Sequence, residues 1–279
     1  MNSKKFILLA IAALMVVALS ACQGAPAKSY KDGIYFAQED DFAANGWKSV
    51  VILEVKDGKI VKAVWNGANR DGKADKITRS MAGQYPIVEK GGAQAPWHEQ
   101  AAKAVEYLLK TQDPDAVKYT DEEGHTDAIS GVSIHVSDFF KTAKKALERG
   151  PVGYGPYKDG TYHAEQADFG PQGWKEYVDI TVIGGRIVAA HWDAVHKDGG
   201  DVKSVRSQNG EYGMKEKGGS QAAWYEQAAK VEAYILKTQD PSAISYKDEE
   251  GHTDAISGVS IHVSSFFELA KEALKNAKK

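Results

Sequence analysis

Residues 121–137 read DEEGHTDAISGVSIHVS, and residues 248–264 read the same seventeen letters without a change. The same offset of 127 positions relates Gly46-Trp47-Lys48 to residues 173–175 and Thr111-Gln112-Asp113-Pro114 to residues 238–241. No insertion or deletion is needed, so the chain is a tandem duplication of one unit. Units of this length indicate two domains and not a solenoid. We place them at 30–149 and 157–279, joined by the Gly- and Pro-rich linker 150–156.

Each copy carries the pattern of an α+β domain. Val178, Ile180 and Val182 alternate with polar or amphipathic residues, which predicts a half-buried strand, and Val51, Leu53 and Val55 match them. Asp57-Gly58 and Gly184-Gly185 are hairpin turn dipeptides, followed by return strands at 60–65 and 187–192. We therefore expect a twisted antiparallel sheet with helices packed on it.

Two helices are predicted in each copy after the strands. The first covers 97–110 and 224–237 and ends before Pro114 and Pro241. The second places an apolar stripe on one face. The stripe consists of Val136, Phe139, Phe140, Ala143 and Leu147 in the first copy and Val263, Phe266, Phe267, Ala270 and Leu274 in the second.

The first 21 residues are typical of a bacterial lipoprotein signal peptide. Lys4 and Lys5 precede an apolar run, and Leu19-Ser20-Ala21-Cys22 resembles a lipobox. We expect Cys22 to be lipidated and 22–29 to tether the first domain to the outer face of the cell membrane. The alternative is an ordinary signal peptide with an incidental cysteine. Cys22 is the sole cysteine, so no disulfide framework is possible.

Composition narrows the classes of protein. The chain is 43% hydrophobic and 26% charged, as in soluble globular domains. Its formal net charge is −3, and two of its lysines lie in the segment expected to be removed. A mildly acidic chain of this kind argues against nucleic acid as the partner.

The segments 127–133 and 254–260, both DAISGVS, carry the chemistry. They resemble the flavinylation motif of the FMN-binding domain family, which includes domains of the Rnf and NQR respiratory complexes. That resemblance implies that a flavin transferase esterifies the hydroxyls of Ser133 and Ser260 to the phosphate of FMN. Val132 and Val259 replace the alanine of the family pattern, and serine replaces the commoner threonine as acceptor.

The residues themselves favour a similar interpretation. Ser130 and Ser257 are good N-cap residues, which would put each acceptor hydroxyl in the first turn of the last helix, where the dipole suits a phosphate. Gly131 and Gly258 leave room for the phosphate and the transferase. We assign Asp127 and Asp254 to recognition or to shaping the loop. Two alternatives stay open: an N-capped helix without a ligand, and recent duplication with gene conversion.

Other candidate contacts are less specific. The six tryptophans form three matched pairs: Trp47 with Trp174, Trp65 with Trp192, and Trp97 with Trp224. At most one pair is assigned to flavin contact, and the sequence does not say which. His125, His135, His252 and His262 are candidates for hydrogen bonds to the flavin. We predict no metal site, because no carboxylate or cysteine joins these histidines at ligand spacing. Gly91-Gly92 and Gly218-Gly219 are interpreted as turns.

The resemblance extends to two-domain FMN-binding lipoproteins of Gram-positive extracellular electron transfer. It implies a carrier with two covalent FMN groups, more an electron-transfer protein than an enzyme with its own substrate. Electrons would come from a membrane NADH dehydrogenase and the quinone pool, and would leave to ferric iron or another extracellular acceptor. The alternatives are a surface ligand-binding or adhesin-type lipoprotein without covalent flavin, and a flavin-dependent reductase of a defined small substrate.

Overall fold

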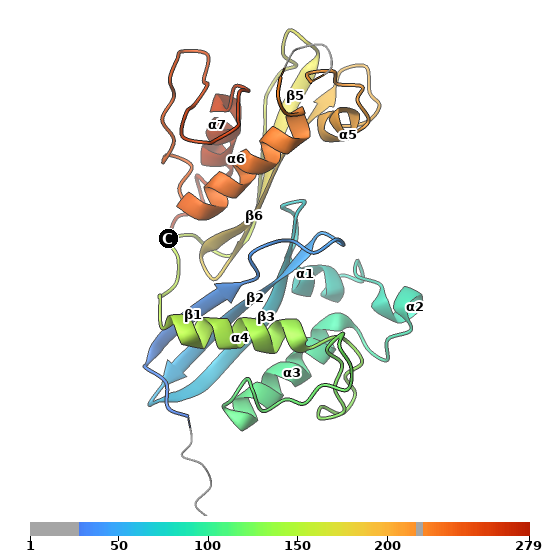
Figure 1. The fold of residues 1–279 in the computed structure, drawn as a ribbon, viewed down its shortest axis with the longest axis vertical. Helices are drawn as coiled ribbons and strands as arrows, with labels where there is room; N and C mark the ends of the chain where they lie inside the picture. The colour runs from blue at the N-terminus through green and yellow to red at the C-terminus, as the bar shows by residue number, and fades with distance from the viewer. Residues whose placement is uncertain (1–27, 216–219) are drawn as a thin grey trace, which may run out of the picture.

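The computed structural model describes residues 28–215 and 220–279, and it contains two similar α+β halves (Figure 1). The first half contains β1 (Gly33–Gln38), β2 (Trp47–Lys56), β3 (Lys59–Asn69), α1 (Lys76–Met81), α2 (Ile87–Gly91), α3 (Trp97–Thr111) and α4 (Ser137–Arg149). The second half contains β4 (Gly160–Glu165), β5 (Trp174–Ile183), β6 (Arg186–His196), α5 (Lys203–Gln208), α6 (Trp224–Thr238) and α7 (Ser264–Ala273). The mixed α+β class is confirmed.

Each half is built on a three-stranded antiparallel sheet, in the order β1-β2-β3 or β4-β5-β6. Both predicted hairpin turns are present as two-residue loops. Asp57 and Gly58 have φ of 52° and 73°, and Gly184 and Gly185 have φ of 65° and 77°. This positive-φ pair is the type I′ geometry that matches strand twist. The return strands β3 and β6 each continue four residues beyond the predicted end.

The long helices α3 and α6 each run one residue beyond prediction. Each ends at a glutamine in the left-handed conformation, Gln112 (φ 58°) or Gln239 (φ 60°). The side chain of Gln112 pairs with both the N–H and the carbonyl of Ile60, and Gln239 pairs in the same way with Ile187. These contacts fasten each helix end to the start of the return strand.

The two long helices of each half cover one face of its sheet and form the core with it. Trp65 stacks on Phe139 at 5.1 Å and meets Trp97 edge-on. Trp192 occupies the same place between Trp224 and Phe266. The predicted apolar stripe on α4 and α7 is confirmed, since its phenylalanines are at most 1% exposed.

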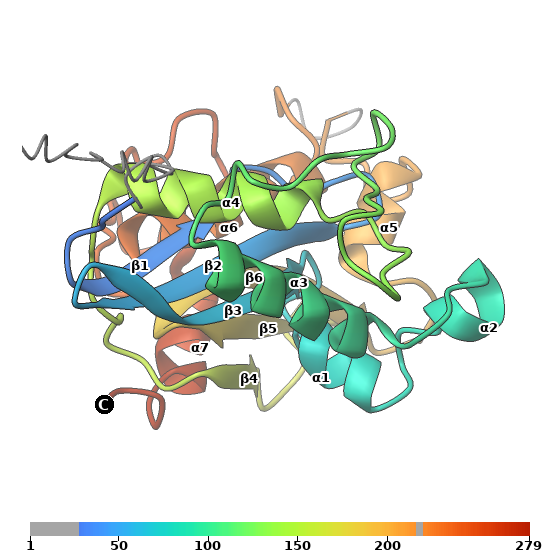
Figure 2. The same cartoon turned by 90° about the horizontal axis from the view of Figure 1, so that it is seen from below.

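Part of the second face of each sheet is also buried, because the two sheets pack against each other. Figures 1 and 2 show α3 and α4 on one face of the first sheet and the second half beyond its other face. The contact cluster consists of Val50, Ile52 and Ala68 from the first half and Ile183, Val188 and Ala189 from the second. The prediction of half-buried strands was therefore wrong: Asp179 and Thr181 on β5 are 5% and 1% exposed.

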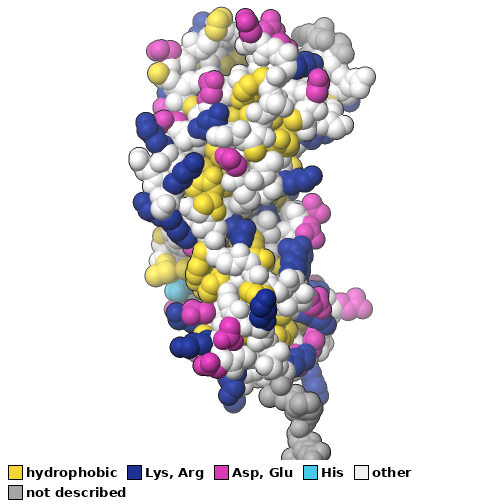
Figure 3. Space-filling view, turned by 90° about the vertical axis from the view of Figure 1, so that its left-hand side faces the viewer, with side chains coloured by type: hydrophobic (Ala, Val, Ile, Leu, Met, Phe, Trp, Pro, Cys, Tyr) yellow, Lys and Arg dark blue, Asp and Glu magenta, His cyan; other side chains and the backbone are white. Residues whose placement is uncertain are grey.

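The predicted signal peptide 1–21, Cys22 and Gly218-Gly219 lie outside the described residues. None of the helices in 28–215 and 220–279 is long and apolar enough to span a membrane. Gly92 forms the left-handed C-cap of α2, so the first glycine pair does end a helix in a turn. One face of the surface carries interspersed basic and acidic side chains with apolar patches in both halves (Figure 3).

Candidate functional site

The DAISGVS segments lie in the long loops that lead into α4 and α7. Ser133 and Ser260 are both exposed. The amide of Ser133 donates a 2.7 Å hydrogen bond to Oε1 of Gln100, and the amide of Ser260 donates an equal bond to Gln227. Each hydroxyl lies 3.3 Å from the same oxygen. The two glutamines are at most 1% exposed, so a buried amide on α3 or α6 fixes each accessible hydroxyl.

The prediction that Ser130 and Ser257 cap the last helix was wrong. Helix α4 begins at Ser137 and α7 at Ser264, with Val136 and Val263 as their N-caps. The physical reason is the glycine after each serine. Gly131 and Gly258 have φ of 71°, a left-handed conformation in which no right-handed helix can start. Ser133 therefore lies four residues before the helix, beyond the first turn, where the dipole acts.

A lysine on each long helix holds this glycine turn. Lys103 Nζ donates to the carbonyl of Gly131 at 3.1 Å, and Lys230 Nζ donates to that of Gly258 at 3.2 Å. A Cβ atom at either glycine would lie 2.5 Å from the lysine nitrogen. The left-handed backbone conformation thus favours glycine at both positions, whereas the flexible lysine end can move aside from a Cβ atom.

Thr126, and not Asp127, shapes the start of the loop. Its hydroxyl donates to the Lys118 carbonyl and accepts from the amide of Ala128. Asp127 is exposed, and Asp254 is exposed with an ion pair of 3.5 Å to Lys247. Of the two roles expected for these aspartates, recognition is the one that an exposed carboxylate suits.

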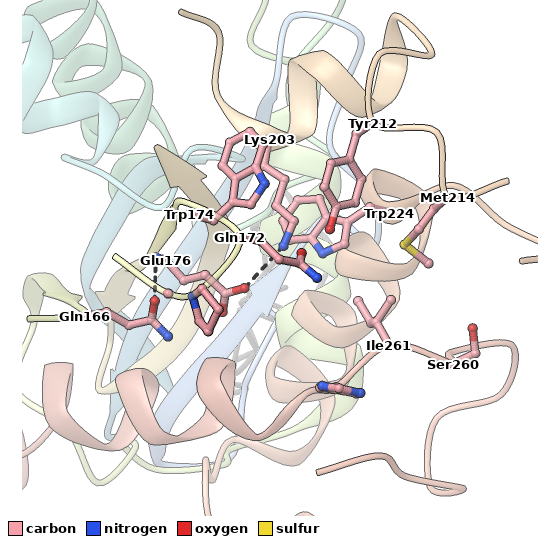
Figure 4. Close-up of a pocket in the computed structure, with 13 residues that line it drawn as sticks. Gln166, Gln172, Trp174, Glu176, Lys203, Tyr212, Met214, Trp224, Ser260 and Ile261 are labelled. Carbon is pink, nitrogen blue, oxygen red and sulfur yellow. Dashed lines mark hydrogen bonds and ion pairs between the residues drawn. The ribbon is translucent and has the colours of Figure 1, made fainter. Parts of the chain in front are cut away.

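In the second half Ser260 lines a cavity of about 580 Å³. Figure 4 shows Trp174, Tyr212, Trp224 and Lys203 grouped on one side and Ser260 on the other. A cavity of this size is in the usual range of small-molecule sites. Aromatic walls suit a flat ligand, and Lys203 and Glu176 add one charge of each sign to the lining.

Lys203 lies at the centre of the aromatic group. Its Nζ is 4.7 Å from the ring centre of Trp224, 5.1 Å from that of Tyr212 and 5.9 Å from that of Trp174. It also forms an ion pair of 3.3 Å with Glu176. Contact of an ammonium with ring faces is favourable, so these interactions hold the charge against the cavity wall.

The first half repeats the aromatic group but encloses less space. Lys76 lies 4.8 Å, 4.9 Å and 5.4 Å from the ring centres of Trp97, Tyr85 and Trp47. Burial lowers the pKa of Lys76 from 10.5 to about 8. The corresponding cavity is about 70 Å³, and Ser133 does not line it. The two halves therefore differ in the room they offer a ligand.

Two of the three tryptophan pairs belong to the aromatic groups around Lys76 and Lys203. Trp174 and Trp224 line the cavity of the second half, and Trp47 and Trp97 line that of the first. Trp192 is 1% exposed and lies in the core, whereas Trp65 is 5% exposed and touches the small cavity of the first half. Trp174 on β5 and Trp224 on α6 both occupy wall positions, and the assignment of at most one pair to flavin contact stays a prediction.

The loops also bring a carboxylate to each pair of histidines. Glu123, His125 and His135 offer one ligand atom each within 4.8 Å of one another, as do Glu250, His252 and His262. The statement that no carboxylate joins these histidines was wrong, because the loop folds back between residues 123 and 135. Sequence spacing alone does not reveal that closure.

Sequence reasoning missed the residues that hold the loop and the cavity wall. These are Gln100 and Gln227, Lys103 and Lys230, and Lys76 and Lys203, each identical between copies. Their identity at the 127-residue offset is the signal that was available. It is a weak signal, because many other positions are also unchanged.

No known protein-family profile matches the chain. The chain is 24% identical over 134 residues to a "15 kDa lipoprotein" of Treponema pallidum, covering 48% of this chain and 86% of that protein. It is also similar to two solved structures. One is an NMR structure from Clostridium thermocellum, with 58% identity, 44% of this chain, 93% of that chain and a TM-score of 0.35. The other is a crystal structure from Clostridium perfringens, with 26% identity, 43% of this chain, 88% of that chain and a TM-score of 0.35. Each relative thus matches a length of about one repeat.

Proposed function

We propose that the chain is an extracytoplasmic electron-carrier lipoprotein with FMN esterified to Ser133 and Ser260. The observation that carries the proposal is the arrangement in the second half. There, an exposed hydroxyl within the DAISGVS segment opens onto an aromatic cavity of about 580 Å³. The resemblance of that segment to the flavinylation motif identifies the modification as a phosphoester between the serine hydroxyl and FMN. Serine is a weak nucleophile by itself, so a flavin transferase is needed to form it.

The residues of the second half fit a flavin mononucleotide. Gln227 holds the backbone on both sides of the acceptor, through the amides of Ser260 and Ile261. The rings of Trp174, Tyr212 and Trp224 supply flat apolar surface. Lys203 lies at the wall as an ion pair with Glu176, so it offers a bound cofactor an N–H donor but little net charge. A bound FMN would supply reversible electron transfer; the chain holds it and sets its potential.

The first half is included because its loop and its buried glutamine are the same. Ser133 is exposed and is held by Gln100 with the geometry found at Ser260. Its aromatic group is closed around Lys76, so a flavin attached there would lie more in solvent. The two sites would then differ in potential, because solvent exposure and nearby charge both change it.

The anchor and partners complete the proposal. The lipobox at Cys22 and the name of the Treponema pallidum relative support a lipid-anchored protein on the outer face of the membrane. A flavin transferase would mature it. A membrane NADH dehydrogenase and the quinone pool would reduce it, and ferric iron or another extracellular acceptor would oxidise it. Covalent attachment suits this location, where a dissociated cofactor is lost.

The intact mass of the mature chain, co-expressed with a flavin transferase, tests the attachment. We expect two FMN groups, one fewer in Ser133→Ala and in Ser260→Ala, and none in the double variant. Ser242→Ala, an exposed serine outside the motif, is the control and should keep both. Colourless protein of unmodified mass would refute the proposal. Saturable turnover of one acceptor, in place of indiscriminate reduction of ferric chelates, would favour a reductase.

A further inference from the structure

A pair of histidines and a glutamate meet in each half, apart from the glutamine contacts that fix the acceptor serines, and one of these histidines, His262, also lines the cavity of the second half. The ring centres of His125 and His135 are 4.2 Å apart, as are those of His252 and His262. Nε2 of His135 lies 3.4 Å from Glu123, and Nε2 of His262 lies 3.7 Å from Glu250. Two donors about 2.1 Å from one ion in tetrahedral geometry are about 3.4 Å apart. The separations are thus close to those of a metal site.

A second carboxylate orients one histidine of each pair. Nδ1 of His125 lies 2.6 Å from Asp121, and Nδ1 of His252 lies 2.7 Å from Asp248. The amides of Gly124 and His125 donate to the other oxygen of Asp121, which fixes that carboxylate. A carboxylate on Nδ1 selects the tautomer that leaves Nε2 with its lone pair, the usual arrangement behind a metal-binding histidine.

We propose that each half binds one divalent transition-metal ion through Glu123, His125 and His135, or through Glu250, His252 and His262. Two imidazoles and one carboxylate are a donor set used for Zn²⁺ and for other first-row ions. The side chains of His135 and Glu123 are 52% and 72% exposed, so water completes the coordination. The site requires no flavin.

Both halves keep this donor set although nearby positions have changed. The glutamate and one histidine of each cluster are exposed, and exposed positions usually diverge after duplication. Near the clusters, Lys118 corresponds to Ser245, Thr120 to Lys247 and Asp138 to Ser265. Segment 121–137, which contains the four residues that form or orient the first cluster, is nevertheless identical to 248–264, so both halves carry the same donor set.

Binding of Zn²⁺ to the full chain tests this proposal. The protein is made without a flavin transferase, purified in detergent and stripped with a chelator, so the result is independent of flavinylation. Calorimetric titration should give two equivalents of Zn²⁺. His135→Asn and His262→Asn should each lose one, and the double variant both. Asp121→Asn keeps the ligands of the first site but should weaken it by about 10- to 100-fold.

Matched glutamates provide the control. Glu122 and Glu249 are exposed neighbours outside the clusters. Glu123→Gln and Glu250→Gln should weaken binding at least about tenfold, whereas Glu122→Gln and Glu249→Gln should leave it unchanged. Circular dichroism of the metal-free variants checks folding. Fewer than two equivalents in the wild type, two retained in the double histidine variant, or equal effects of the neighbouring glutamates would overturn the proposal.

Discussion

At the scale of single residues, two buried glutamines decide how the acceptor serines are presented. Gln227 Oε1 accepts hydrogen bonds from Ser260 and Ile261, while its Nε2 donates to Ser220 and the Ala222 carbonyl. One side chain therefore forms the hydrogen bonds of the acceptor loop and also those of the segment that precedes α6. Because Gln227 is 1% exposed, water cannot replace it.

Gln227→Leu should remove the hydrogen bonds that position Ser260 and should leave Ser133 unchanged. Leucine cannot accept from the amide of Ser260, so unfolding free energy should fall by about 1–3 kcal/mol in urea titration. FMN at Ser260 should fall in peptide mass spectrometry, with Ser133 in the same chain as internal reference. Gln221→Leu, at an exposed position, is the control. Equal FMN occupancy at Ser260 in the two variants would contradict a positioning role for Gln227.

At the scale of elements, β6 and α6 of the second half share an ionisable pair that the first half lacks. His191 lies 3.5 Å from Glu232, where the equivalent residues are Val64 and Val105. Burial raises the pKa of Glu232 above 4.5. Burial by itself lowers the pKa of His191, but Glu232, Asp193 and Asp179 raise it above 6.5 overall. The folded state therefore binds protons more tightly than the unfolded state at both groups.

The double variant His191→Val with Glu232→Val introduces the residues found in the first half. It should flatten the pH dependence of the unfolding free energy. In the wild type, the stabilisation from Glu232 is complete below about pH 4.5 and that from His191 below about pH 6.5. Both contributions are lost as the pH rises through the raised pKa values of the folded state, so the unfolding free energy falls from acid to neutral pH. The double variant should be as stable as the wild type or more stable by about 1–4 kcal/mol, because apolar residues replace a buried ion pair. Glu232→Val alone should be less stable by about 3–5 kcal/mol, because it leaves His191 without its partner. Urea unfolding between pH 4.5 and 8 measures this, and parallel pH curves would contradict it.

At the scale of the whole molecule, the halves are joined back to back through their sheets. The contact is apolar at Ile52 and Val188, and it is extended by a hydrogen bond from the Thr181 hydroxyl to the Lys73 carbonyl. The linker adds to it, since the amides of Val152 and Gly153 donate to Ile34 and that of Gly155 donates to Gly184. We therefore expect the halves to unfold together.

Val188→Asp should separate the two unfolding events. It buries an unpaired carboxylate at a position that is 0% exposed, which opens the sheet contact. Val61 is the equivalent residue of the first half and is 44% exposed, so Val61→Asp is the matched control and should stay within about 0.5 kcal/mol of wild type. Differential calorimetry should show one transition for wild type and Val61→Asp and two for Val188→Asp. One unshifted transition in all three would contradict the coupling.

Local signals in the sequence determined the duplication, the α+β class, both hairpin turns, and the bounds of α3 and α6 to within a residue. These features depend on neighbours along the chain: a turn dipeptide, an apolar period, and a stop before proline. The contact between Gln227 and Ser260, and the cavity that Lys203 and Ser260 line, had no such local signal. Packing alone brings these three residues together.

Tertiary structure decided the rest. The second face of β5 is buried because another sheet covers it, which alternation within one strand cannot express. The last helix starts at Ser137 and not after Ser130, because Gly131 takes a left-handed turn that Lys103 holds from a different helix. Glu123 and His135 meet because the loop between them closes on itself. In each case the deciding contact joins residues distant in sequence, and only the folded chain brings them within reach.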